Sequence, residues 1–226
     1  MGKVNYYING IDIRSYGVHV GAGKGLLSLP ERKKGVSHSY DNEHGISVDT
    51  ESCFVKERKI TLSCFTDKMT HSQFLTALAN FKLALMTGGL FQLLLSIEGA
   101  EPIPYMVYWD GKADVTPRYN GYRQVGTFEL TLVEPEPVKR VWKVVTATSG
   151  VHVGINLSSG LSKYYNIYWG DGDTDPGITI GEGVSHEYAS AGTYYIVLTG
   201  DVANLVTTTS ANSAQRTITQ LWSQLL

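Results

Sequence analysis

The sequence predicts a mainly β protein with one clear α-helix, and three observations carry this prediction. Short runs that alternate apolar and polar residues recur along the 226 residues, as they do in half-buried strands. Many of the 24 glycines stand between these runs, where turns are expected. Residues 71–86 instead repeat their apolar residues at helical spacing. At ~100–200 residues per domain, the length allows one large domain or two small ones.

The N-terminal region opens with two short predicted strands between residues 6 and 20, joined at Asn9-Gly10. Asn-Gly favours a tight hairpin because both residues tolerate positive φ. Residues 21–25 are expected to form a flexible loop. They lack the Gly-Lys-Ser/Thr order of a phosphate-binding loop, because Lys24 is followed by Gly25. Further strands are expected in residues 46–65, 90–95, 105–109 and 126–133.

The helix expected at about residues 71–86 has recognisable start and stop signals. Thr70 and Gln73 fit a capping box, in which each side chain satisfies a backbone N–H of the first turn. Gly88-Gly89 is expected to end the helix through a left-handed cap. A single apolar stripe indicates that the helix packs against a sheet. The stripe consists of Phe74, Leu78, Phe81 and Leu85.

A domain boundary is predicted at Glu134-Pro135-Glu136-Pro137, since alternating prolines favour an extended segment. The chain then divides into a first domain (1–136), a second domain (137–206) and a C-terminal extension (207–226). The second domain is expected to be a sandwich of short strands. These strands are placed at residues 141–146, 151–157, 165–169, 179–180, 184–188 and 193–199. The extension is expected to end in a short amphipathic helix, from the spacing of Ile218, Leu221, Trp222, Leu225 and Leu226.

Composition excludes several classes of protein. Hydrophobic residues make up 42% and the formal net charge is −2, which does not fit a disordered chain. A near-neutral chain lacks the basic footprint of a nucleic-acid-binding protein, so no specific nucleic-acid binding is expected. No segment approaches the ~20 apolar residues of a membrane span. The N-terminal residues show no apolar region of a signal peptide.

Two cysteines are present, Cys53 and Cys64, each in a strand-like run. Neither has a partner at the spacing of a redox or zinc motif. We interpret them as small half-buried side chains in a reducing compartment. A disulfide between them is the alternative that the sequence leaves open.

No catalytic constellation is found, so the sequence predicts neither an enzyme nor a cofactor. There is no Gly-x-Ser-x-Gly elbow and no His-Glu-x-x-His motif. The histidines are scattered, and only His38 and His44 share a polar loop, with Asp41 and Glu43. A transition-metal site is one interpretation of that loop. A plain solvent-exposed connection is the interpretation that we favour.

The first domain resembles the N-terminal domain of phage distal tail proteins over residues 1–136. The resemblance lies in an opening Tyr-Tyr-Ile-Asn-Gly-Ile-Asp strand at 6–12, a stretch at 55–64, one amphipathic helix, and a closing strand at 126–132. It implies a β-sandwich or split barrel flanked by one helix. It further implies a subunit of a hexameric ring that joins the tail tube to the tip, with a central channel for DNA.

The second domain resembles the PKD type of immunoglobulin-like domain over residues 138–206. The family pattern is W-G-D-G, then H-x-Y, then A-G-x-Y-x-V. This chain carries all three parts, and it departs at Tyr195 and Ile196, where smaller residues are frequent. The structural residues that carry the resemblance are Trp169, Gly170, Asp171, Gly172, His186, Tyr188, Gly192 and Tyr194.

These motif residues are expected to be structural. Trp169 supplies core surface, and the two glycines around Asp171 permit positive φ in a tight turn that the carboxylate caps. Tyr188 and Tyr194 are expected to pack beneath the turn, with their hydroxyls reaching backbone groups.

The same turn carries alternating carboxylates, which suggests calcium as a second interpretation. Hard oxygen ligands suit Ca²⁺. The candidate ligands are Asp171, Asp173, Asp175 and Glu182. However, Pro176 stands where an EF-hand loop requires glycine. We favour an acidic exposed loop, with no bound metal, over a calcium site.

Together the two resemblances imply a non-enzymatic structural component of a phage or prophage tail. Its partners would be other copies of itself, other tail proteins and, through the second domain, cell-surface glycans. Its location would be the virion tail, assembled in the bacterial cytoplasm. Two alternatives stay open: a tail-tube subunit, and a monomeric adhesion or glycan-binding module of a bacterial surface.

Overall fold

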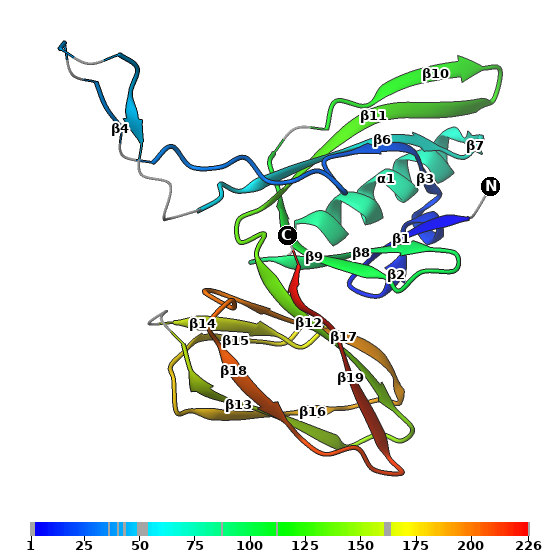
Figure 1. The fold of residues 1–226 in the computed structure, drawn as a ribbon. Helices are drawn as coiled ribbons and strands as arrows, with labels where there is room; N and C mark the ends of the chain where they lie inside the picture. Colours follow the sequence, from blue (N-terminus) through cyan, green and yellow to red (C-terminus); the bar gives the residue numbers. More distant parts are fainter. Residues whose placement is uncertain are drawn as a thin grey trace.

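The computed structural model describes residues 3–35, 37–39, 41–42, 44–48, 54–86, 88–111, 113–160 and 164–225. Within these residues the chain is mainly β with one α-helix, so the predicted fold class is confirmed. Two hydrophobic cores are present, one from residues between Ile8 and Leu132 and one from residues between Trp142 and Leu205. Figure 1 shows the two β bodies one above the other.

The first β body is an antiparallel sheet that curls around its core. Its strand order is β2-β1-β8-β9-β11-β6-β3. The two halves meet where β9 pairs with β11, at Leu132 and Trp109. The strand bounds are β1 Val4–Ile8, β2 Ile11–Asp12, β3 Val18–Lys24, β6 Arg58–Thr66, β8 Phe91–Ile97, β9 Ile103–Trp109 and β11 Arg123–Glu134.

Shorter elements complete this body. Its outlying pieces are the 3-10 helix η1 (Ile13–Tyr16), β4 (Ser37–His38), β5 (Ser47–Val48), β7 (Met69–Thr70) and β10 (Thr116–Asn120). The hairpin predicted at Asn9-Gly10 is confirmed, with φ of 47° and 79° at the two residues. The loop predicted at residues 21–25 is wrong up to Lys24, because β6 supplies backbone partners to Ala22, Gly23 and Lys24.

Helix α1 (His71–Leu85) closes the core of the first body, as predicted. Thr70 and Gln73 form the capping box, and the four residues of the apolar stripe are all buried. The predicted left-handed glycine cap is wrong. The helix ends instead at Met86, whose N–H donates to the carbonyls of Lys82 and Leu83, and Met86 is not left-handed.

The second β body consists of two facing sheets, with strand orders β15-β14-β17-β12-β19 and β16-β13-β18. The bounds are β12 Lys139–Thr146, β13 Val151–Ser159, β14 Tyr165–Tyr168, β15 Thr174–Ile178, β16 Gly183–Tyr188, β17 Gly192–Thr199, β18 Val206–Thr209 and β19 Arg216–Leu225. The strand predicted at 179–180 is wrong. It lies earlier, because residues 174–178 pair with β14 and a turn follows.

The C-terminal helix predicted in residues 207–226 is also wrong. Residues 206–209 pair with β13, and residues 216–225 pair with β12 as an edge strand. A register shift between Val141 and Trp142 leaves Leu221 as an extra residue on β19. Leu221 and Trp222 then both pack against the small apolar cluster between the two bodies, which satisfies their apolar surface without a helix.

Candidate functional site

A long arm projects from the first β body. It leaves the core after Leu26 and returns at Arg58, and its described residues (27–35, 37–39, 41–42, 44–48 and 54–57) extend away from both bodies (Figure 1). Two backbone hydrogen bonds join the two sides of its base, from Lys33 N–H to the Phe54 carbonyl and from Lys56 N–H to the Glu31 carbonyl. The strands β4 and β5 pair farther out. The arm is therefore an ordered hairpin along its described residues.

Large apolar side chains lie exposed along this arm. Leu29 is 80% exposed and Phe54 is 68% exposed. The exposed apolar residues of the arm are Leu27, Leu29, Ile46, Val48 and Phe54. Burying such side chains stabilises a complex by about 1.5–3 kcal/mol each. A set of them on one projecting element marks a surface for protein contact.

The root of the arm is fixed by the body beneath it. The Leu26 carbonyl accepts a hydrogen bond from the Tyr105 hydroxyl at 2.6 Å and another from Arg58 NH1 at 3.3 Å. The Leu26 side chain itself belongs to the first core. The point from which the arm departs is thus set by buried contacts rather than by a flexible linker.

The same residues reach the junction between the two bodies. Glu134 ends β11 and Lys139 begins β12, and both side chains are fully buried. They form an ion pair, and Arg58 Nε lies 3.5 Å from Glu134 Oε2. Lys139 Nζ stands 4.4 Å from the centre of the Tyr105 ring. Arg58 Cζ lies 5.5 Å from the same ring centre, so one carboxylate serves two cations that both lie over the Tyr105 ring.

Burial controls the titration of this cluster. Loss of hydration lowers the pKa of Lys139 to about 8, and the Glu134 charge opposes that change. The same cause raises the pKa of Glu134, against the attraction of Lys139 and Arg58. Burial also raises the pKa of Tyr105 to about 12. These are the shifts expected when charged groups leave water together.

Apolar and polar contacts join the two bodies around this cluster. Met106 of β9 packs with Val141 of β12 and Val197 of β17. Gln92 Nε2 donates to the Tyr195 carbonyl at 2.9 Å. The segment predicted as an extended linker therefore lies between two bodies that share a buried interface.

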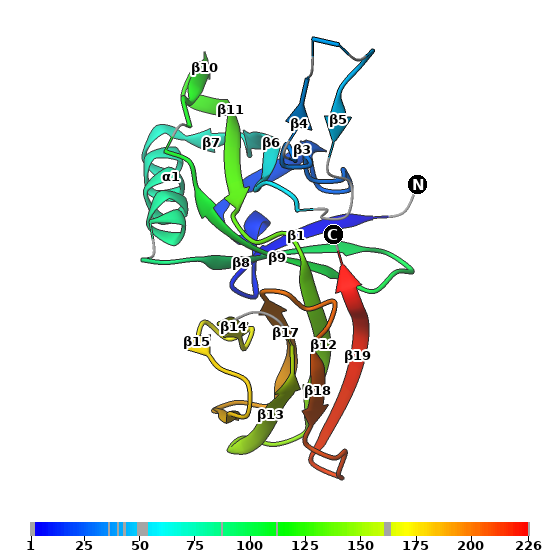
Figure 2. The ribbon, with the colours of Figure 1, turned by 60° about the vertical axis from the view of Figure 1, so that its left-hand side comes forward.

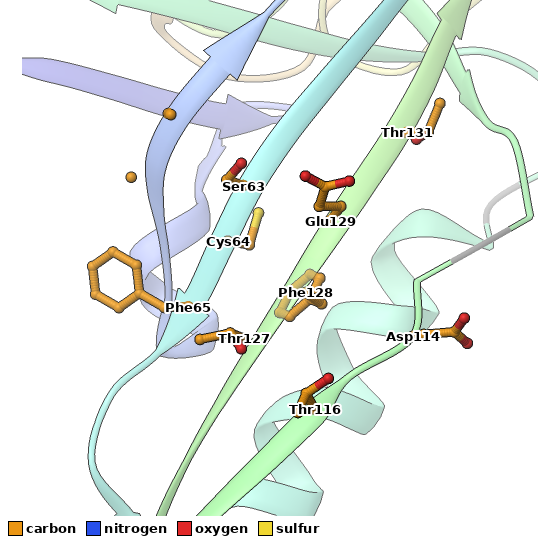
Figure 3. Close-up of a pocket in the computed structure, with 11 residues that line it drawn as sticks. Ser63, Cys64, Phe65, Asp114, Thr116, Thr127, Phe128, Glu129 and Thr131 are labelled. Atoms are coloured by element: carbon orange, nitrogen blue, oxygen red, sulfur yellow. The ribbon is translucent and has the colours of Figure 1, made fainter.

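A shallow trough of about 750 Å³ runs along the outer face of the first sheet. Figure 3 shows Ser63, Thr127 and Glu129 projecting from β6 and β11 into it, with Asp114 at its side. Its described lining mixes apolar surface with hydroxyl groups and two carboxylates, and it contains no lysine or arginine. A phosphate backbone would meet repulsion here rather than attraction.

Gly170, Asp171 and Gly172 form the turn at the end of β14. Gly170 has φ of 90°, and a Cβ there would meet the Tyr195 backbone at 2.7 Å, so only glycine fits. Gly172 has φ of 111°. Asp171 Oδ1 accepts the Asp173 N–H at 3.2 Å and so caps the turn.

The other motif residues surround Trp169, which is buried. The His186 ring stacks on the indole at 5.0 Å between centroids, and Tyr188 meets the His186 ring edge-on. The Tyr188 hydroxyl donates to the Trp169 carbonyl, and its ring stacks on Tyr194. Gly192, at the start of β17, donates its N–H to Thr146.

The predicted calcium ligands do not all meet. Asp175 accepts a hydrogen bond from Trp169 Nε1 at 2.8 Å, and Glu182 accepts one from the Thr179 N–H at 2.8 Å. Asp171, Asp173 and His186 do come together, with one ligand atom from each lying within 4.8 Å of the others. The calcium ligand set from sequence spacing lacked His186, because this residue lies on β16, in the sheet that faces the one containing β14.

The polar loop with His38 and His44 lies on the arm. His38 lies in β4 on the arm, and Glu43 is outside the described residues. Among the residues that the structure describes, only the Asp171 group could hold a metal by ligand proximity. Cys64 is a free buried thiol, and burial raises its pKa to about 12. Cys53 lies outside the described residues.

No helix in the described part of the chain is long and apolar enough to cross a membrane. The fold and its surfaces therefore define a class: a two-body β protein with a projecting apolar arm and polar, shallow hollows. Such a molecule is suited to assembly and contact.

Comparisons with known proteins find similarity among solved structures only. No protein-family profile matches it, and no curated protein matches it in sequence. Among solved structures it is similar to "Crystal Structure of SPP1 Dit (gp 19.1) Protein, a Paradigm of Hub Adsorption Apparatus in Gram-positive Infecting Phages". The identity is 12%, the TM-score is 0.47, and 96% of this chain and 97% of that chain are covered.

Proposed function

We propose that this chain is a non-enzymatic structural subunit of a phage or prophage tail. In this proposal the first body forms a ring, expected to be a hexamer, that joins the tail tube to the tip. The second body makes contacts with other tail proteins or with a cell-surface glycan. The protein would be located in the virion tail after assembly in the bacterial cytoplasm.

The arm is the observation that carries this proposal. Its exposed apolar side chains, Leu29 and Phe54 among them, favour burial against a neighbouring chain. The contact it would make is heterologous, since an arm of one copy meets a different surface of the next. Heterologous contacts close into rings when the rotation between copies allows it.

The direction of the projections adds support. The β10–β11 hairpin carries exposed Tyr119 and Tyr122 near its tip. Figure 2 shows this hairpin and the arm on the side of the first body that faces away from the second body. Assembly through the first body would therefore leave the second body outside the contacts. Copies of it in a ring would give weak contacts the benefit of multivalency.

The sequence resemblance supplies the kind of assembly. The opening hairpin at Asn9-Gly10, the helix α1 and the closing strand β11 follow in the order that suggested a distal tail protein. The trough beside β11 carries Asp114 and Glu129. A weakly acidic surface suits a channel through which DNA must pass without sticking.

Absolute mass in solution, with negative-stain images of the same peak, tests the proposal. We expect a mass of six chains and rings with a central hole. The double variant Leu29→Glu/Phe54→Glu should yield a folded monomer, because two charges then meet the apolar contact. Val206→Glu, at an exposed apolar residue of the second body, is the matched control and should still assemble.

Other outcomes would redirect the assignment. Long stacked tubes in place of single rings would favour a tail-tube subunit. A monomer at every concentration, with glycan binding by the second body, would favour a surface adhesion module. Assembly that survives both arm charges would contradict the role of the arm.

A further inference from the structure

In the cluster of Asp171, Asp173 and His186, both ring nitrogens of the histidine face carboxylate oxygens. Capping of the turn does not explain this arrangement. His186 Nε2 lies 2.7 Å from Asp171 Oδ2, and its Nδ1 lies 4.0 Å from Asp173 Oδ2. Both nitrogens of one imidazole thus face carboxylates. The ring is nearly buried, whereas Asp173 is 78% exposed at the surface.

A neutral imidazole cannot satisfy both contacts. It carries one N–H, which the short contact places on Nε2, as donor to Asp171. Nδ1 then presents a lone pair toward the negative oxygen of Asp173. Two electron-rich groups face each other, and no lysine or arginine forms an ion pair with either carboxylate in the described part of the chain. A cation between Nδ1 and Asp173 would resolve this mismatch.

The surroundings hold the ring in the orientation that such a cation requires. Trp169 stacks on one face of the imidazole, and Tyr188 meets it edge-on. Asp171 uses one oxygen for the His186 ring and the other for the Asp173 N–H. A histidine that binds a metal through one nitrogen commonly donates its other N–H to a carboxylate, as here.

We propose that this loop binds a divalent transition ion such as Zn²⁺. His186 Nδ1 and the Asp173 carboxylate are the ligands, Asp171 is the positioning residue, and water completes the coordination. An imidazole nitrogen is a good ligand for Zn²⁺, Ni²⁺ and Cu²⁺, whereas Ca²⁺ prefers oxygen ligands only. The site replaces the calcium ligand set suggested by sequence spacing. It does not depend on ring assembly.

Calorimetric titration of the chelator-treated full chain with Zn²⁺ tests the site. We expect a binding event that is lost in Asp173→Asn, whose exposed side chain makes this variant safe for folding. Asp171→Asn should weaken the affinity about tenfold or more. Asp175→Asn and Glu182→Gln are matched controls in the same loop region. Each keeps an oxygen acceptor for its present hydrogen bond, so both should bind Zn²⁺ like the native chain.

Thermal unfolding provides the second measurement, because a ligand that binds the folded state raises Tm. Zn²⁺ should raise Tm in the native chain and both controls but not in Asp173→Asn, and Ca²⁺ should have no effect. Unchanged Zn²⁺ binding in Asp173→Asn would overturn the proposal. So would equal binding of Ca²⁺. So would no Zn²⁺ binding at all, which would indicate that a protonated His186 bridges the two carboxylates instead.

Discussion

The arm leaves large apolar side chains in solvent, whereas the junction between the two bodies buries charged ones. On the arm, Leu29 and Phe54 have no core to enter. At the junction, Glu134 and Lys139 are withdrawn from water and paired. Both regions run against the usual distribution of polar and apolar residues. The junction pairs its charges within the chain, whereas the apolar side chains of the arm stay exposed in the single chain.

From this difference we expect the junction to govern the stability of the fold and the arm to govern assembly. Buried charges that have lost a partner are costly to the fold itself. Exposed apolar residues contribute little to the fold of a single chain and much to an interface. Substitutions in the two regions should therefore have opposite consequences, and this contrast can be tested directly.

The largest effect is expected from Glu134→Gln. It leaves Arg58 and Lys139 buried without an anion, which should lower the free energy of unfolding by about 3–5 kcal/mol. Lys139→Met should cost less than about 2 kcal/mol, since the Arg58–Glu134 pair remains balanced. Urea unfolding of both variants measures the difference. Equal costs would show that Glu134 does not serve both cations.

A pH-dependent stability is expected from Lys139. Its pKa is about 8 in the folded chain and its ordinary value is 10.5. Between these values the unfolded chain binds more protons, so the free energy of unfolding should rise with pH. We expect a rise of ~1–2 kcal/mol between about pH 7.5 and about pH 9.5. Denaturant titrations at both pH values should show the rise in the native chain and not in Lys139→Met.

Tyr105→Phe sharpens the comparison because Tyr105 belongs to both regions. The change removes the hydroxyl that donates a hydrogen bond to the Leu26 carbonyl at 2.6 Å. It keeps the ring that lies against Lys139. We expect a loss of about 1 kcal/mol. Hydrogen exchange should accelerate at the base of the arm. Faster exchange throughout the second body would show instead that the hydroxyl supports the junction.

The smallest effect on the fold is expected on the arm. Leu29→Ser with Phe54→Ser should change the free energy of unfolding of the monomer by less than about 0.5 kcal/mol. Chemical denaturation at concentrations below assembly measures this. A loss comparable to that of Glu134→Gln would mean that the arm packs on its own chain and would remove the contrast between the regions.

Local signals predicted α1 and the first hairpin correctly, because each is written in neighbouring residues. The capping box at Thr70 and the stripe from Phe74 are set by helical periodicity. Strand β3 was missed at Gly21–Lys24, since its pairing with β6 joins residues some forty positions apart in sequence. Backbone partners supplied from a distance override a weak local preference.

The candidate sites likewise divide into features that are local in sequence and features that depend on distant residues. The turn after Trp169 contains two glycines with positive φ, a feature that is local in sequence. The approach of His186 to Asp173 depends on how the sheet that contains β16 faces the sheet that contains β14, and sequence spacing does not predict this packing. The C-terminal strand β19 was misassigned because the spacing of Ile218, Leu221 and Trp222 suits a helix as well as a bulged strand.

Leu26 links the two regions mechanically. Its carbonyl accepts hydrogen bonds from Tyr105 and Arg58. The Tyr105 ring also lies against Lys139, the first residue of β12, and Arg58 lies beside Glu134, the partner of Lys139. The base of the arm and the start of the second body are thus anchored by the same group of buried residues. A neighbouring chain that binds the arm would therefore also fix the orientation of the second body. In a closed assembly, every copy would hold its second body at the same angle.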